Sequence, residues 1–321
     1  MSRAALADPV IVASWFVEGG TVQQPTIFPK EWSRPGLGCE EHQIPSPKEP
    51  AVTAIDLPAL APEYEETRAT IHAYTNAVIA IPRAHGIAHP KWWHVGLEVR
   101  PEGLVTDPIP LPDGRIIAFT MDLQHHAIIL RSSDGAERRF DPAAGLTGTE
   151  MGDAVIAAAS EFGLDEPYDH ARFESDEPRA YDPVAAATYF DAFTKVTAIF
   201  ERHRIAIGER VGPVQVWPHG FDLAFEWFGT RTVDRGDEVL PAQINLGFYP
   251  GGDPYFYSSP WPFDASLTDV PLPHGAVWNT DGWQGAMLPY ATVRNHPDPT
   301  AALTDFARAV FDAAAPSLTA P

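Results

Sequence analysis

The stretch VQVWPHGFDLAFEWF, residues 214–228, constrains the fold more than any other segment of the chain. Its aromatic and β-branched residues are typical of a β-strand. It follows residues 182–205, which have the periodicity of an amphipathic helix and begin at an Asp-Pro start signal. We therefore predict a helix, a short loop and one strand that carries aromatic and histidine side chains, with a turn at residues 229–231.

The same order of elements occurs earlier in the chain. Residues 63–81 carry apolar side chains at three- and four-residue steps, which predicts a helix that ends at the following proline. The segment WWHVGLEVR, residues 92–100, alternates in polarity and predicts a strand with one buried face. Trp93 and His94 then correspond to residues 217–219, so the chain contains two related halves.

The remaining segments predict an antiparallel sheet in each half. Predicted strands cover residues 104–110, 115–123, 126–133, 138–140, 242–250, 254–262 and 282–293. Further helices are predicted at residues 148–162 and 300–314, the second ending before Pro316. The fold class is therefore α+β, with two related halves that each form an antiparallel sheet flanked by helices. A pseudo-twofold axis is one way to join the two sheets.

The domain organisation follows from a change in composition. Residues 21–60 are rich in Pro, Glu and Ser and show neither helical nor strand periodicity, so residues 1–56 are predicted to form an extended N-terminal arm. Residues 57–165 form the first α+β half and residues 166–321 the second. We expect the two halves to pack as one compact unit.

The composition restricts the partners of the protein. A formal net charge of −21 repels phosphate backbones and anionic lipids, so neither nucleic acid nor a membrane is an expected partner. The excess negative charge either reflects ordinary carboxylates on the surface or serves to attract a cationic ligand. The single cysteine, Cys39, cannot form an intramolecular disulfide, and no secretory signal is apparent, so a cytoplasmic location is expected. The sequence is also compatible with a homo-oligomer.

Residues 217–226, WPHGFDLAFE, combine a histidine with a carboxylate. In a regular strand His219 and Asp222 point to opposite faces, whereas a bulge would bring them together. Asp222 would then orient His219 as a general base, with His94 of the first half opposite, and these three are the candidate catalytic residues. The alternative is structural, with a histidine at a strand edge and an aspartate that caps a turn.

Tryptophan and tyrosine recur in segments punctuated by Gly and Pro. Residues 246–263 predict a rigid loop that displays aromatic rings, and residues 274–290 mix indoles with hydrogen-bonding groups. Such rings suit an organic or cationic ligand, although they could equally close the end of a sheet. The candidate substrate-binding residues are Trp93, Trp217, Tyr255, Tyr257, Trp261, Trp278 and Trp283.

No metal site is predicted, and the sequence identifies no cofactor. The pairs His85 with His89 and His125 with His126 lack a helical HExxH context and thiolate partners. The Ser-Ser pair at residues 258–259 lacks the GxSxG elbow of a serine nucleophile.

Several short strings carry a family resemblance. WWHVGLEV followed by GLVTDPIP, and VWPHGFDLAFEWFGTR with GFYPGGDPYFYSSPWP, resemble the bacterial domain-of-unknown-function family 5996. The resemblance extends from Leu57 to Ala314. It implies membership of an uncharacterised family and brings no activity, cofactor or catalytic residue.

Three functional hypotheses follow. The first is an enzyme that acts on a small organic molecule by acid-base chemistry in an aromatic cleft, with His219, Asp222 and His94 as its catalytic groups. The second is a non-catalytic protein that binds a small molecule through its Trp and Tyr side chains. The third is a protein-interaction scaffold whose N-terminal arm reaches a second subunit.

Overall fold

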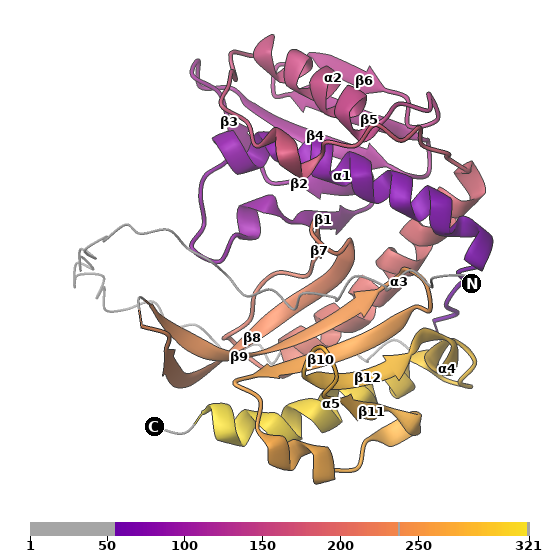
Figure 1. Ribbon diagram of the computed structural model, residues 1–321, viewed down its shortest axis with the longest axis vertical. Coiled ribbons are helices and arrows are strands. Elements are labelled where there is room, and N and C mark those ends of the chain that lie inside the picture. Colours follow the sequence, from indigo (N-terminus) through magenta and orange to yellow (C-terminus); the bar gives the residue numbers. More distant parts are fainter. Residues whose placement is uncertain (1–54, 237, 320–321) are drawn as a thin grey trace, which may run out of the picture. The chain divides into compact units, whose positions relative to one another are not determined.

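The computed structural model describes residues 55–236 and 238–319 (Figure 1). The predicted N-terminal arm, residues 1–56, lies outside the described residues except for Ile55 and Asp56, and Cys39 lies outside them as well. The described residues have the predicted α+β fold, in which helices flank an antiparallel sheet.

The first half forms an antiparallel meander with two helices. Its helices are α1 (Glu65–His85) and α2 (Gly148–Ser160), and its 3₁₀ turns are η1 (Pro62–Tyr64), η2 (Trp93–Val95) and η3 (His170–Arg172). Its strands are β1 (Leu97–Arg100), β2 (Gly103–Thr106), β3 (Ile109–Pro110), β4 (Ile116–Asp122), β5 (Ala127–Ser132) and β6 (Glu137–Phe140).

The second half begins with a long helix and ends with another. Its helices are α3 (Pro183–Ala206), α4 (Tyr290–Arg294) and α5 (Pro299–Leu318), and its 3₁₀ turns are η4 (Ala265–Asp269) and η5 (Pro273–Gly275). Its strands are β7 (Gln215–Trp217), β8 (Asp222–Asp234), β9 (Val239–Tyr249), β10 (Tyr255–Trp261), β11 (Val277–Asn279) and β12 (Gly285–Pro289).

The strands of both halves form one sheet instead of two separate ones. The 12-stranded sheet has the order β11-β12-β10-β9-β8-β7-β1-β2-β4-β5-β6, and β3 pairs with β4. The halves meet where β1 pairs antiparallel with β7, in the register Leu97 to Val216 and Glu98 to Gln215. This pairing satisfies backbone groups that two isolated sheet edges would leave open. Figure 1 shows the strands of the first half above and those of the second half below.

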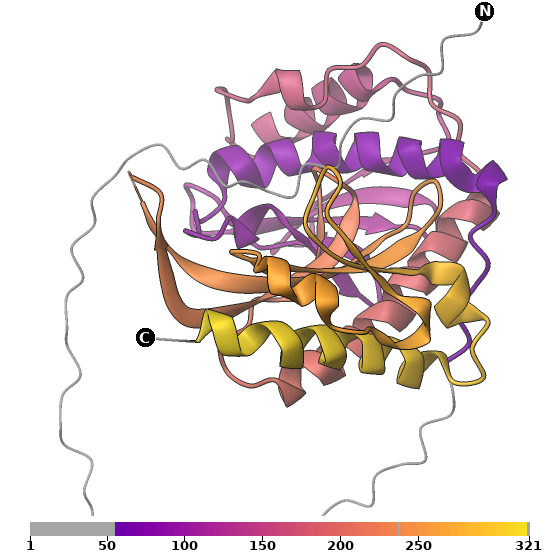
Figure 2. The same ribbon diagram turned by 60° about the horizontal axis from the view of Figure 1, so that its bottom comes forward.

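The hydrophobic core lies between the sheet and the helices. Phe193 of α3 packs against Phe248, and Phe200 of the same helix packs against Phe225 and Phe256. Helix α5 lies along β8, β9 and β10, as Figure 2 shows at the bottom of the molecule. Alternate residues of these strands therefore face the helices, and the residues between them point to the opposite face of the sheet.

Two predicted helix ends are wrong. Helix α1 continues beyond Pro82 to His85, and the N–H of Gly86 still donates to the Pro82 carbonyl at 2.8 Å. Helix α5 continues past Pro316 because strand β8 holds its last turn. The Thr230 hydroxyl donates to the Thr319 carbonyl at 2.7 Å. A proline near a helix end removes only one bond, and neighbouring contacts make up for it.

Three predicted strands also differ from the structure. The predicted strand at 282–293 is reduced to β12, because residues 290–293 belong to helix α4. Residues 92–96 do not start a strand but contain η2 (Trp93–Val95), which follows Trp92 with its left-handed φ of 60°. Residues 214–228 form the hairpin β7-β8 and not one strand, since Phe221 has a φ of 53° and its N–H donates to the Trp217 carbonyl at 2.8 Å. The predicted turn at 229–231 lies inside β8, at a register shift in its pairing with β9.

No helix among the described residues is both long and apolar enough to cross a lipid bilayer.

The aromatic core predicts a large loss of stability when Phe256 is truncated. Phe256 is fully buried and contacts Phe200, Phe248 and Tyr290, so Phe256→Ala should lower the free energy of unfolding by about 3–5 kcal/mol. Val277→Ala, at a side chain that is 52% exposed, is the control and should change stability by less than about 0.5 kcal/mol. Urea unfolding monitored by circular dichroism measures both, and equal effects would contradict this description of the core.

Candidate functional site

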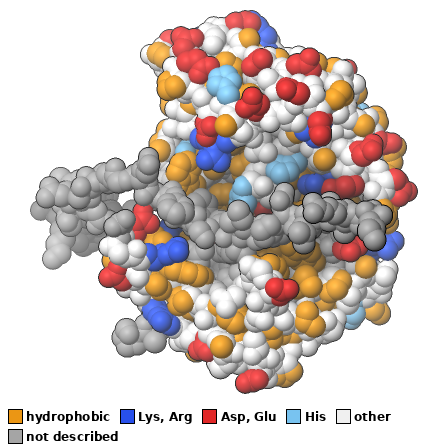
Figure 3. Space-filling view, viewed as in Figure 1, with side chains coloured by type: hydrophobic (Ala, Val, Ile, Leu, Met, Phe, Trp, Pro, Cys, Tyr) orange, Lys and Arg blue, Asp and Glu red, His pale blue; other side chains and the backbone are white. Residues whose placement is uncertain are grey.

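The sheet of the second half has a face opposite the helices, and we call it the site face. Cross-strand register places its residues in rows, for example Glu226 with Asn245 and Asn245 with Ser259. The residues of the site face are Gln215, Trp217, Asp222, Ala224, Glu226, Phe228, Gln243, Asn245, Gly247, Tyr249, Tyr255, Tyr257, Ser259 and Trp261. In Figure 3 hydrophobic side chains gather over the lower part of the molecule, where Figure 1 places β10 and β12.

Tyr257 lies flat across the neighbouring strand because Gly247 has no side chain. A Cβ atom at Gly247 would lie 2.1 Å from Cζ of Tyr257, so only glycine leaves room for the ring. The Tyr257 hydroxyl reaches across β9 in this way and donates a hydrogen bond to Oδ2 of Asp222 on β8. Burial raises the pKa of Tyr257 well above its ordinary value, and the nearby Asp222 raises it further, so the phenol keeps its proton.

Glu226 is the second carboxylate of the site face, four residues after Asp222 on the same strand. It is buried, and burial raises its pKa from 4.5 to about 7. The charge of Lys91 opposes this increase and the charge of Asp222 adds to it. Glu226 therefore exchanges its proton close to neutral pH, which an exposed glutamate does not do.

Gly212 and Trp93 enclose the Glu226 carboxylate. A Cβ atom at Gly212 would lie 2.5 Å from Oε2 of Glu226 and 3.0 Å from Cζ2 of Trp93, so a glycine is required where the three meet. The indole N–H of Trp93 faces the carboxylate and lowers its pKa, although the pair lacks the geometry of a well-formed hydrogen bond. His89 stacks on the indole ring at 4.2 Å between ring centroids.

Five buried polar atoms at this site lack a hydrogen-bond partner among the described residues. They are Nε1 of Trp93, Oε1 of Gln215, Oδ1 of Asp222, Oε2 of Glu226 and Oγ of Ser259. Four belong to side chains of the site face, and the fifth belongs to Trp93, which borders Glu226. Buried polar groups are nearly always paired, so such a concentration marks a place where a ligand or water supplies the missing bonds.

Aromatic rings border the site face at the β10 and β12 side. Trp283 stacks on Tyr255 with 6.4 Å between ring centroids and meets Tyr257 edge-on at 6.2 Å. Gly285 makes room for this arrangement, because a Cβ atom there would lie 2.6 Å from the Trp283 ring and 2.8 Å from Oγ of Ser259. Three rings and the unpartnered Ser259 hydroxyl therefore lie together.

The structure brings most of the predicted binding residues to one site. Tyr255 and Tyr257 project from strand β10 and not from a loop, and Trp217 lies opposite Asp222 in the β7-β8 hairpin. Trp261 ends β10, where Arg235 lies over its ring at 5.7 Å. The members of the predicted set at the site face or its border are Trp93, Trp217, Asp222, Tyr255, Tyr257, Trp261 and Trp283.

Three predicted residues lie elsewhere. His219 is exposed in the turn between β7 and β8, and the hydrogen-bond partner of Asp222 is Tyr257. His94 is buried in η2, where its Nδ1 accepts from the backbone N–H of His89 at 3.2 Å and burial lowers its pKa. Trp278 is in register with Ala286 and so faces the helices, where it joins a hydrophobic cluster with Trp227.

Sequence reasoning missed Glu226, Ser259 and the glycines that accommodate the large side chains. The alternation of a strand that starts at Asp222 puts Glu226 on the same face, and this signal was available in the sequence. His72 of α1 was also missed. Its Nε2–H donates to the Pro218 carbonyl at 2.7 Å, and burial lowers its pKa to about 4, so it holds the hairpin as a neutral imidazole.

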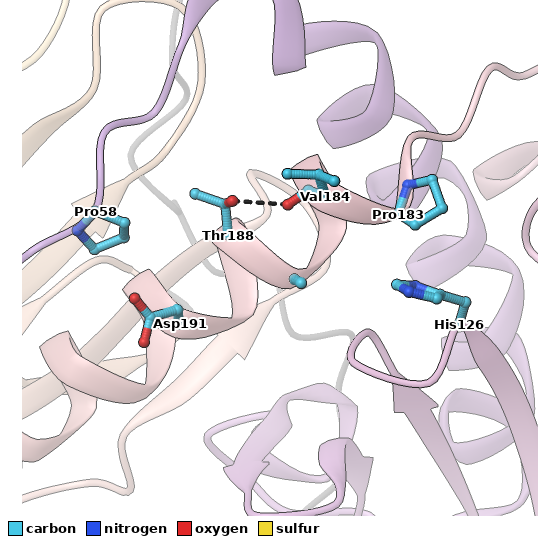
Figure 4. Close-up of a pocket in the computed structure, with 7 residues that line it drawn as sticks. Pro58, His126, Pro183, Val184, Thr188 and Asp191 are labelled. Carbon is cyan, nitrogen blue, oxygen red and sulfur yellow. Dashed lines mark hydrogen bonds between the residues drawn. The ribbon is translucent and has the colours of Figure 1, made fainter.

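A separate depression of 420 Å³ lies on the first half of α3 (Figure 4). Its polar groups already have partners: the Thr188 hydroxyl donates to the Val184 carbonyl at 2.7 Å, and Lys195 donates to Asp191 at 2.7 Å. The depression therefore carries no chemistry comparable to that of the site face. Within residues 55–236 and 238–319, no three His, Cys, Asp or Glu side chains are grouped to hold a metal ion.

The close contact between Gly247 and Tyr257 predicts that substitutions at the two positions have non-additive effects on stability. Gly247→Ala should lower the free energy of unfolding by about 1–3 kcal/mol, because the new methyl group collides with the ring. In a Tyr257→Ala background the same substitution should cost almost nothing. A double-mutant cycle measured by urea unfolding tests this, and additive effects would show that the two residues do not meet.

The raised pKa of Glu226 predicts a pH dependence of stability. The folded state holds the Glu226 proton up to about pH 7, whereas the unfolded state loses it near pH 4.5. Stability is therefore greatest below pH 4.5 with respect to this group and falls as pH rises through 7, by on the order of 3 kcal/mol. Glu226→Gln removes this loss, so the variant should gain stability over the wild-type protein between pH 5 and pH 8.

The wild-type protein must be compared with the variant, because two buried histidines change the pH dependence of stability in the opposite direction to Glu226. Burial lowers the pKa of His72 and His203 to about 4, so their contributions to stability increase as pH rises from 4 to 6.5. Both histidines are present in the wild-type protein and in the variant, so their contributions cancel when the two stabilities are subtracted. Stability curves for the two proteins that run parallel from pH 5 to pH 8 would refute a raised pKa at Glu226.

Comparison with known proteins places the chain in a family. No curated protein and no solved structure matches it. A family model described as a family of unknown function matches residues 57–319, which include the strands and helices of both halves and every residue of the site face. The chain therefore belongs to the family of unknown function DUF5996.

Proposed function

We propose that the protein binds a small organic molecule on the site face. The observation that carries this proposal is the group of five buried polar atoms without a partner, at Trp93, Gln215, Asp222, Glu226 and Ser259. Each such atom costs about 1–3 kcal/mol of stability when it stays unpaired. A ligand that forms hydrogen bonds with several of these atoms recovers part of this free energy, and the gain favours binding at this site.

The surroundings of these atoms support an organic ligand over water alone. Tyr255, Tyr257 and Trp283 contact one another beside Ser259 and offer broad apolar surfaces. A few polar groups set among aromatic walls are characteristic of small-molecule sites. The depression on α3 is a weaker candidate, because the polar side chains that line it are already hydrogen-bonded.

A second candidate function is acid-base catalysis on the bound molecule. It is favoured by Glu226, whose pKa of about 7 suits a general base or acid at neutral pH. We place this role at Glu226 and not at His219, because His219 is exposed in a turn and Asp222 is bonded to Tyr257. Asp222 would fix the Tyr257 hydroxyl, and the Ser259 hydroxyl would donate to the substrate.

Two neighbouring serines provide a matched test of binding. Ser259 lies on the site face, whereas Ser258 is equally buried and faces the helices. A fragment library is screened against the wild-type protein by ligand-observed NMR. Fragments that bind the site face should lose about 5–10-fold in affinity in Ser259→Ala and keep their affinity in Ser258→Ala, because only one hydroxyl meets the ligand.

The screen separates the outcomes clearly. A set of fragments weakened by Ser259→Ala alone supports binding at the site face. Fragments that bind the two variants and the wild-type protein equally, or no fragment at all, would refute the proposal. Melting temperatures of both variants confirm that each has folded. For the catalytic candidate, conversion of a bound fragment by the wild-type protein and not by Glu226→Gln is the required result.

A further inference from the structure

The site face contains two carboxylates and no counter-charge bonded to them. Among the described residues, the ion pairs of the protein involve neither Asp222 nor Glu226, although both are buried. The cation that acts on Glu226 is Lys91, and its Nζ lies over the Phe228 ring at 4.5 Å. Lys91 and Arg235 lie over rings of this face, but neither forms an ion pair with its carboxylates. A buried carboxylate without an ion pair is costly, so a cation bonded directly to the carboxylate is the missing group.

The unpartnered atoms at the site are mostly acceptors. Oε1 of Gln215, Oδ1 of Asp222 and Oε2 of Glu226 can only accept a hydrogen bond when the carboxyls are ionised, and the Ser259 hydroxyl can accept as well. Gln215 and Ser259 are 1% and 3% exposed, so water reaches them poorly. A matching ligand must therefore offer hydrogen-bond donors.

Aromatic rings stand beside these acceptors. Tyr255, Tyr257 and Trp283 form one cluster, and Trp93 borders Glu226. Faces of Trp and Tyr attract cations through the ring quadrupole. The formal net charge of −21 adds a long-range field that draws cations towards the protein and repels anions.

From this geometry we infer that the ligand of the site face carries a primary ammonium group, which binds the Glu226 carboxylate beside Trp93 while its organic part contacts the aromatic rings. The inference rests on the proposed binding function and adds the chemical class of the ligand. A primary ammonium combines a positive charge with three N–H donors. A quaternary ammonium has the charge but no donor, and a carboxylate or phosphate would face Asp222 and Glu226 with like charge.

Binding of an ammonium should also be coupled to the proton on Glu226. The charged or titratable groups around this carboxyl are Lys91, Asp222 and Tyr257, and the Trp93 indole adds a dipole. A bound cation favours the ionised carboxyl, so affinity should increase from pH 6 to pH 8 as Glu226 loses its proton. The amine itself stays protonated over this range.

The test uses matched ligand series that differ only in the polar group. For benzyl, cyclohexylmethyl and n-butyl side chains, the primary ammonium, trimethylammonium, alcohol and carboxylate are titrated by ligand-observed NMR at pH 7.5. We expect the primary ammonium of at least one series to bind about tenfold more tightly than its alcohol and its trimethyl analogue, with no binding of the carboxylate. Glu226→Gln should reduce the preference for ammonium over alcohol to less than about threefold, whereas Asp222→Asn, at a carboxylate that does not touch the ammonium, should keep most of it.

The outcomes distinguish this inference from the function on which it rests. If fragments depend on Ser259 but the alcohols or carboxylates bind as well as the ammonium compounds, the ligand class is wrong and the binding function stands. If no ammonium compound binds while other fragments depend on Ser259, the ligand class is again wrong. If nothing binds in a Ser259-dependent way, the proposed function itself fails. Ser258→Ala, which should keep the wild-type preference, is the control for all three series.

Discussion

The pairing of β1 with β7 is the contact on which the rest of the structure depends. It joins the two meanders into one sheet, and it sets the segments that precede each strand side by side. Trp93 lies just before β1 and Gly212 just before β7, so this junction brings the indole of one half to the Glu226 carboxylate of the other. The Gln215 side chain fastens the contact by donating from Nε2 to the Trp93 carbonyl at 3.0 Å. The site thus belongs mainly to the second half but is complete only with a side chain of the first.

Glycines at three positions explain how large and polar side chains share a small area. Gly212, Gly247 and Gly285 each lie where a Cβ atom would come within 2.8 Å of a site side chain. Because these three positions carry no side chain, the rings of Trp93, Tyr257 and Trp283 can approach the backbone closely. The opposite face of the same strands is filled by phenylalanines against α3. One face therefore supplies stability, which offsets the unpaired polar groups that the other face retains.

Much of the architecture could be predicted from the sequence, because it depends on local sequence patterns. The α+β class, the meander of the first half and the long helices follow from periodicity and from turn residues. What could not be predicted depends on contacts between distant residues. Phe221 adopts a left-handed conformation since it packs against His72 and Phe193, and this turns one predicted strand into a hairpin. For the same reason Asp222 is bonded to Tyr257, which lies 35 residues later, and not to nearby His219.

The register shift in β8 has a mechanical consequence. Beyond Phe228 the strand departs from regular pairing, and there it is bonded to the end of α5 through Thr230 and Arg231. Gly229 allows this approach, since a Cβ atom there would lie 2.0 Å from the Leu318 carbonyl. The two carboxylates of the site face occupy the first part of the same strand. A pulling force on the C-terminal helix therefore acts on the strand that carries Asp222 and Glu226, as well as on β9 and β10, which the helix also contacts.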